Sequence, residues 1–100
     1  MTTVLKSSAA QTLLGVGAIR VFPNPSNGIF WLQLASEKTL RLEISLCNPT
    51  GQVLQRRHIT AASGVSTWPV ETTGLPTGAY TLIAKDEKGG VWRQCLLLGD

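Results

Sequence analysis

The chain has 100 residues, which is enough for one domain with a single modest core. Apolar residues make up 43% of it and charged residues 15%, which excludes intrinsic disorder, because disordered chains are poor in apolar and rich in charged side chains. The net charge of +3 is scattered apart from Arg56-Arg57-His58, so the sequence lacks the dense basic stripe with interleaved aromatic residues that is typical of nucleic-acid binding.

Residues 1–17 form the first predicted segment, a linker or leader ahead of the domain. Thr, Ser, Ala, Gln and Gly dominate it, and a short helix over Ala9–Leu14 would have poor caps. No run in the chain reaches the roughly 18 apolar residues that a membrane helix needs. We therefore predict that the folded domain covers residues 18–100.

The first predicted strand, Ile19–Phe22, ends at the turn Pro23–Gly28. The two prolines of this turn lack backbone donors, so no β-ladder can run through it. Its closing Asn-Gly pair tolerates positive φ, which suits a tight turn. The second strand, Ile29–Ala35, alternates two sets of side chains: Phe30, Leu32 and Leu34 against Trp31, Gln33 and Ala35.

The third strand is the clearest in the chain, because apolar and polar residues alternate strictly. Its predicted buried face is Leu40, Leu42, Ile44 and Leu46, and its predicted wet face is Arg41, Glu43, Ser45 and Cys47. The turn Asn48–Gly51 follows, with proline at its second position and glycine at its fourth, as in a type I turn. The next strand, Gln52–Thr60, alternates imperfectly, which is typical of an edge strand or a bulged strand.

Three more strands complete the pattern: Val65–Val70, Ala79–Lys85 and Val91–Leu98. Pro69 favours a sheet edge for the first of them, because proline cannot donate to a ladder. Turns separate all seven strands at intervals of about 8–12 residues, and no segment after residue 17 has a helical period. The sequence therefore predicts an all-β fold, an immunoglobulin-like β-sandwich of about seven antiparallel strands.

Reactive side chains are few. Cys47 and Cys95 do not form a Cys-x-x-Cys pair and are accompanied by one histidine, so we expect no structural zinc; two free thiols are favoured over a disulfide. His58 has no orienting carboxylate nearby in sequence, and the acids fall at turns or on wet faces: Glu37, Glu43, Glu71, Asp86 and Glu87. We predict no catalytic residues, no metal and no cofactor.

Three motifs occur in order along the predicted strands: Val21–Gly28, Leu42–Leu54 and Leu75–Tyr80. Together they resemble the patterns "YPNPxxG", "hxhxhxDxxGxhh" and "LxxGxYxh", with h apolar, of the type A C-terminal sorting domain of the bacterial type IX secretion system. The resemblance covers about residues 19–98, with Asn48-Pro49 where the family more often has Asp and only one basic residue in the last strand. The residues that carry it are Pro23, Asn24, Pro25, Gly28, Gly51, Leu75, Pro76, Gly78 and Tyr80.

This resemblance implies a non-catalytic signal domain that directs an attached cargo protein across the outer membrane. Its implied partners are the outer-membrane secretion machinery and a sortase-like protease that cuts in the preceding linker. The implied route is the periplasm, then the outer membrane, the cell surface or the extracellular space. A short final strand ends such domains, so the candidate recognition residues are Val91, Trp92, Arg93, Gln94, Cys95, Leu96, Leu97 and Leu98.

Three alternatives to this secretion-signal hypothesis remain. The motif residues could serve the fold alone rather than contact the machinery. We expect Pro-Asn-Pro to form an extended, poorly hydrogen-bonded bend and Tyr80 to return to the core with its hydroxyl on a backbone partner. A carbohydrate-binding or adhesion module would require Trp31, Trp68 and Trp92 to share an exposed face. Self-association through the last strand is also open, because an apolar edge strand invites pairing with another chain.

Overall fold

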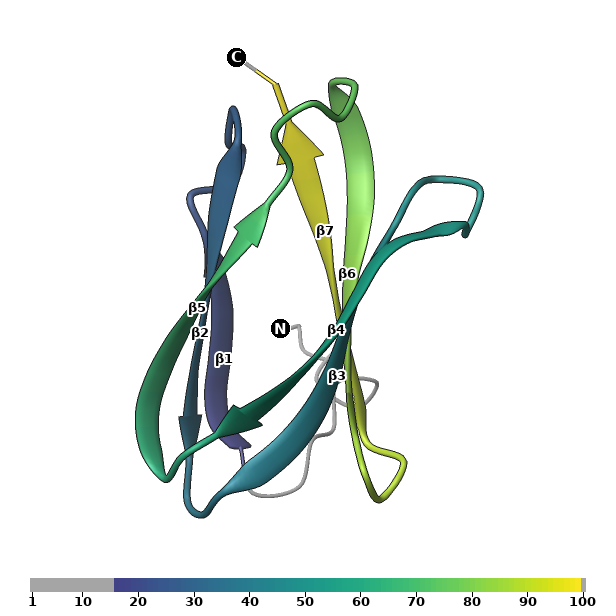
Figure 1. Cartoon of the computed structure of the whole chain (residues 1–100). Helices are drawn as coiled ribbons and strands as arrows, with labels where there is room; N and C mark the ends of the chain where they lie inside the picture. The colour runs from purple at the N-terminus through teal and green to yellow at the C-terminus, as the bar shows by residue number, and fades with distance from the viewer. Residues whose placement is uncertain (1–15, 100) are drawn as a thin grey trace, which may run out of the picture.

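The computed structural model describes residues 16–99, which form two antiparallel sheets packed face to face (Figure 1). This confirms the predicted all-β sandwich of seven antiparallel strands. The strands are β1 Val16–Phe22, β2 Ile29–Ser36, β3 Leu40–Cys47, β4 Val53–Ala61, β5 Gly64–Glu71, β6 Gly78–Asp86 and β7 Val91–Leu98. None of the described residues forms a helix that is long and apolar enough to cross a bilayer.

The smaller sheet has the order β1-β2-β5 and the larger has the order β4-β3-β6-β7. The chain crosses between the sheets after β2, after β4 and after β5, and it makes hairpins within a sheet elsewhere. The predicted edge position of the proline-containing strand is confirmed, since β5 ends the smaller sheet. The strand with imperfect alternation, β4, is an edge strand of the larger sheet. Its pairing with β3 also shifts register between Leu46 and Cys47.

The core fills the space between the sheets, because each strand turns alternate side chains inward. The predicted buried face of β3 is buried, apart from Leu40, which is half-buried, and the sets Phe30, Leu32 and Leu34 of β2 and Tyr80, Leu82 and Ala84 of β6 are buried as well. Burying one such Leu, Ile or Phe side chain stabilises the fold by about 1.5–3 kcal/mol. The buried cluster is Phe30, Leu32, Leu34, Leu42, Ile44, Leu46, Ile59, Ala61, Val70, Tyr80, Leu82, Ala84, Trp92, Leu96 and Leu98.

Three details differ from the sequence-based expectations or lie beyond them. The first strand begins at Val16, three residues before the predicted Ile19. Gly28 lies outside the left-handed region, so the turn does not use this glycine for positive φ. The proposed helix over residues 9–14 lies outside the described residues.

Candidate functional site

The segments that carry the motifs meet at one end of the sandwich, the upper end in Figure 1. We call this the motif end and define it as residues 23–28, 48–52, 72–77 and 97–99. The first three segments connect β1 to β2, β3 to β4 and β5 to β6, and the fourth comprises the end of β7 and the residue after it. Direct bonds join two of the segments, because Thr72 donates to the Gly28 carbonyl from both its backbone N–H and its hydroxyl, each at 2.8 Å.

The turn with two prolines is bonded to the last strand, and sequence reasoning did not anticipate this contact. Asn24 Nδ2 donates to the Cys95 carbonyl at 2.9 Å, and Asn24 Oδ1 accepts from the Leu97 N–H at 2.9 Å. The Ser26 N–H donates to the Leu97 carbonyl at 3.0 Å, and the Ser26 carbonyl accepts from the Gly99 N–H at 2.8 Å. The expectation of a poorly hydrogen-bonded bend is therefore wrong, because the turn bonds to a strand more than 70 residues away in the sequence.

Ser26 also fixes the shape of the turn from within. Its buried hydroxyl donates to the Ile29 carbonyl at 2.6 Å and accepts from the Gly28 N–H at 3.3 Å. Both X-Pro bonds of the turn, Phe22-Pro23 and Asn24-Pro25, are cis. Ser26 was not among the predicted motif residues; a hydroxyl two residues before a glycine was the available signal, because serine commonly bonds nearby backbone groups in turns.

Tyr80 has the role that turn chemistry suggested for it. The segment before it leaves the smaller sheet and enters the larger one, and Tyr80 is only 6% exposed. Its hydroxyl donates to the carbonyl of Pro76. Gly78 begins β6 with a φ of 149°, a conformation that favours glycine. The Leu-Pro-Thr-Gly turn is thus held by a side chain that is itself anchored in the core.

The turn after β3 shows why Asn48 can replace the aspartate of the family pattern. Asn48 Oδ1 accepts from the N–H groups of Thr50 and Gln52 at 3.1 and 2.9 Å, as a carboxylate oxygen would. The Gly51 N–H donates to the Asn48 carbonyl at 2.9 Å, as expected for the predicted turn. The turn after β6 has the same arrangement with aspartate, since Asp86 Oδ1 accepts from the N–H groups two and four residues later.

The predicted recognition strand presents only part of itself to solvent. Trp92, Leu96 and Leu98 are buried in the core, whereas Arg93, Cys95 and Leu97 are exposed and Val91 and Gln94 are half-buried. Leu97 is the most prominent of the apolar ones, at 50% exposure. The outward side chains lie on the outer face of the larger sheet, next to the β6 residues that face them: Ala79 opposite Leu97, Thr81 opposite Cys95 and Ile83 opposite Arg93.

The two thiols are free and belong to the same outer face. Cys47 and Cys95 each pair with Thr81, from opposite sides, so two strand spacings of about 4.8 Å separate them. That distance exceeds the reach of a disulfide. The parity that assigned Cys47 to the polar face is correct, but its side chain is buried, whereas Cys95 is exposed.

The three tryptophans do not share a face. Trp31 is 40% exposed on the outer face of the smaller sheet, between Phe22 of β1 and Pro69 of β5 in register. Trp68 is half-buried on the opposite side of that sheet, and Trp92 is 3% exposed in the core. A platform of three tryptophans is therefore excluded, and only Trp31 could offer a ring to a ligand.

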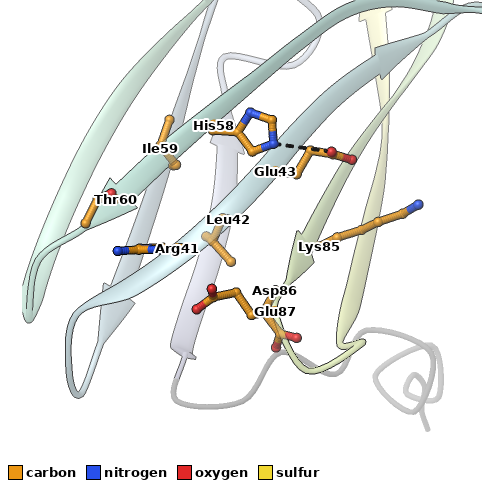
Figure 2. A pocket seen from close by; sticks show the side chains of 9 residues that line it. All are labelled: Arg41, Leu42, Glu43, His58, Ile59, Thr60, Lys85, Asp86 and Glu87. Carbon is orange, nitrogen blue, oxygen red and sulfur yellow. Dashed lines mark ion pairs between the residues drawn. The ribbon is translucent and has the colours of Figure 1, made fainter.

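A broad hollow of about 540 Å³ lies at the end of the sheet opposite the motif end, over β3, β4 and the start of the β6–β7 turn (Figure 2). Here His58 Nε2 lies 3.4 Å from Glu43 Oε2, and Arg56 Nε lies 3.9 Å from Glu43 Oε1. Sequence reasoning missed this carboxylate because Glu43 reaches His58 across the β3–β4 register. His58 and Arg56 are exposed and Glu43 is half-buried, and ion pairs this accessible to solvent contribute little to stability.

The hollow carries no recognisable catalytic or metal-binding set. Its lining includes both cations and carboxylates, and Figure 2 shows Lys85 and Arg41 pointing in different directions. Among residues 16–99, no group of three or more His, Cys, Asp or Glu side chains is placed to hold a metal ion. The residue types at the motif end are likewise suited to holding strands together rather than to activating a nucleophile.

Comparison with known families gives the class of the protein. The family described as the secretion system C-terminal sorting domain matches residues 20–97. The chain therefore belongs to this family: it is a C-terminal sorting domain for type IX secretion, a class of generally non-catalytic domains whose proteins are exported across the outer membrane to the cell surface or the extracellular space.

Other comparisons give less. A search of curated protein sequences gave no match. Among solved structures, the crystal structure of hypothetical protein PH1083 from Pyrococcus horikoshii OT3 is similar, with a TM-score of 0.44 and 10% sequence identity over 86% of this chain and 91% of that one.

Proposed function

We propose that this domain is recognised in its folded form by the type IX secretion machinery at the outer membrane, after transit of the cargo through the periplasm. A sortase-like protease would then remove it by cutting in the segment ahead of β1. The observation that supports this most is the arrangement of β7, whose outward residues Arg93, Cys95 and Leu97 are exposed, the last of them at the motif end. Recognition by this face requires the whole sandwich, because the inward half of the same strand is core.

The proposal is tested by fusing the full chain to a secreted reporter in a host that has the type IX system. Leu97→Glu changes an outward residue of β7 that is 50% exposed. Val65→Glu is the matched control, because Val65 is 70% exposed on the other sheet and receives the same charge. We expect Leu97→Glu to lower export several-fold and Val65→Glu to leave it near the level of the unchanged domain.

Two results would count against the proposal. If the fusion with the unchanged domain places no reporter at the cell surface, the domain does not direct export. Equal export by the Leu97→Glu and Val65→Glu fusions, with both domains folded by thermal melting, would show that the outward face of β7 is not what the machinery reads. Cleavage is followed in the same cells by the size of the released reporter, which should end before β1.

A second candidate function, glycan binding, is supported by a single observation. Trp31 is 40% exposed on the outer face of the smaller sheet, between Phe22 and Pro69, and an exposed aromatic ring can stack against a sugar ring. The Phe22 ring is already covered by the Arg20 guanidinium, 4.8 Å from its centroid. Titration with cell-wall glycans should then change the tryptophan fluorescence of the protein but not that of Trp31→Ala. A flat response in the unchanged protein would remove this candidate.

A further inference from the structure

The free edge of β7 is covered from Cys95 to Gly99 by the turn that contains Asn24 and Ser26. In an antiparallel edge strand, every second residue points its N–H and C=O away from the sheet, where another strand could bind. In β7 these outward groups include the Cys95 carbonyl, both backbone groups of Leu97 and the Gly99 N–H. All four are bonded by Asn24 and Ser26. The turn therefore takes the place that an added strand would need.

Asparagine is chemically suited to this position. A side-chain carboxamide copies a peptide group, with one carbonyl to accept and N–H bonds to donate. At Asn24 the two functions meet the Cys95 carbonyl and the Leu97 N–H at the same distance of 2.9 Å. An aspartate of the same shape can only accept when ionised, and it would set a carboxylate oxygen against the Cys95 carbonyl. The prolines on either side have no N–H of their own to compete for these groups.

We propose that Asn24 is a lock on the edge of the terminal strand. The carboxamide makes two of the four bonds between the turn and β7, and the Ser26 backbone makes the other two. While all four are in place, the stretch from Cys95 to Gly99 cannot pair with a strand of a second copy of this chain. Without the carboxamide the two remaining bonds no longer hold the turn against β7, and the same stretch offers an apolar strand edge to such a copy. A consequence that rests on the proposed function is that the secretion machinery meets β7 through its outward side chains and not by strand addition along this stretch.

Amide hydrogen exchange tests the lock directly. We expect Asn24→Asp at pH 7 to speed exchange at the Leu97 amide by about tenfold or more, because repulsion between the ionised carboxyl and the Cys95 carbonyl moves the side chain off β7 and breaks its bond to that amide, while amides of β3 keep their protection. Asn27→Asp is the matched control, because it places the same charge at an exposed position of the same turn. Protonation converts the new carboxyl to a group with one donor and one acceptor, so protection at Leu97 should return toward the unchanged level below about pH 3.5.

Self-association provides the second readout. Asn24→Ala should form concentration-dependent dimers or larger species in sedimentation experiments, and Asn27→Ala should stay as the unchanged protein does. Faster exchange spread evenly over the domain in Asn24→Asp would overturn the lock, since it would mean a general loss of stability. So would unchanged exchange at Leu97, or an Asn24→Ala protein that associates no more than its control.

The export assay separates this inference from the proposed function. Export by the unchanged fusion with a several-fold loss in Asn24→Ala, and none in Asn27→Ala, would support reading of the locked strand. Full export by an Asn24→Ala domain whose edge has opened by hydrogen exchange would overturn that consequence while leaving the proposed function standing. Failure of the unchanged fusion would contradict the proposed function and leave the exchange and association results to decide the lock.

Discussion

The outer edges of β7 and β5 are both hydrogen-bonded, but the chain covers them by different means. At β7 a turn supplies its own backbone and one short side chain, from residues more than 70 positions away. At β5 two long side chains of the neighbouring β4 reach across: Gln55 Nε2 donates to the Glu71 carbonyl at 2.7 Å and Arg57 Nη1 to the Pro69 carbonyl at 2.8 Å. Pro69 fits this edge because it has no N–H to leave unpaired.

Because the two edges are covered by different means, we expect the residues that cover β7 to tolerate substitution less than those that cover β5. Long side chains can reach a carbonyl from several rotamers, although ordering them costs about 1.5–2 kcal/mol each. A backbone turn has no such freedom, and its short carboxamide must stand at one place. The family motif accordingly includes Asn24 and its flanking prolines, whereas β4 carries no motif residue after Leu54. The two edges thus differ in how tolerant they should be to substitution.

The largest expected effect on stability comes from truncating the core side chains that anchor the edge strands β7 and β5. Leu96→Ala removes a side chain of β7 that is fully buried and should lower the free energy of unfolding by about 2–5 kcal/mol. Val70→Ala does the same in β5 but removes one carbon less, so its loss should be smaller. Urea denaturation measures both. A smaller loss for Leu96→Ala would mean that the turn, rather than the core, holds β7 in place.

Tyr80→Phe tests the connection from β5, an edge strand of the smaller sheet, to β6, the neighbour of the edge strand β7. Tyr80 lies in β6, directly beside β7, and its hydroxyl bonds the turn that comes from β5. Its removal should cost about 1–1.5 kcal/mol, because the Pro76 carbonyl is exposed enough to find water. For a domain of this size, each kcal/mol lowers the melting temperature by about 4–8 °C. A melting temperature within 1–2 °C of the unchanged protein, in the range that about 0.3 kcal/mol would produce, would contradict this role.

At the edge of β5, Arg57→Met keeps an unbranched, flexible side chain and removes the guanidinium donors. We expect a loss of about 0.5–1 kcal/mol, since Arg57 is exposed and the Pro69 carbonyl can be hydrated. The matching comparison is Asn24→Ala, which should cost more because it breaks two bonds at once. The tolerance argument would be wrong if chemical denaturation gave the larger loss for Arg57→Met.

The smallest effect is expected at the turn after β3. Asn48→Asp should change stability by less than about 0.5 kcal/mol, because a carboxylate keeps both acceptor bonds, as Asp86 does in the turn after β6, and loses only the exposed bond from Asn48 Nδ2 to Gln52 Oε1 at 3.1 Å. Asn24→Asp should cost more, since the Asn24 carboxamide donates to a backbone carbonyl of β7 rather than to an exposed side chain. Equal losses in parallel thermal melts would show that the donor function of Asn24 has no special weight.

Strand pattern and parity were largely predictable from the sequence. The alternation of β3 fixed which side chains face the core, and Pro69 indicated an edge, because each follows from local geometry. The strands were placed within three residues of their observed starts. The burial of Cys47 on a nominally wet face was not predictable, because it depends on neighbours from other strands.

The contacts of the candidate site needed the structure. Nothing local connects Asn24 to Leu97 or Glu43 to His58, since both contacts depend on how distant strands are ordered and registered. Two prolines around an asparagine marked a special turn without saying what it bonds. The tryptophans show the same limit, because parity separated Trp31 from Phe30 and Leu32 but could not tell which of the three tryptophans face solvent.

The direction of β1 sets how a passenger hangs from this domain. β1 runs toward the motif end, so whatever precedes it joins the sandwich at the far end. Its seven residues span about 23 Å, at roughly 3.3 Å each. The start of β1 therefore lies at the opposite end of the sandwich from Asn24 and Leu97. Under the proposed recognition of the motif end, cargo proteins of very different shapes would leave that end sterically free.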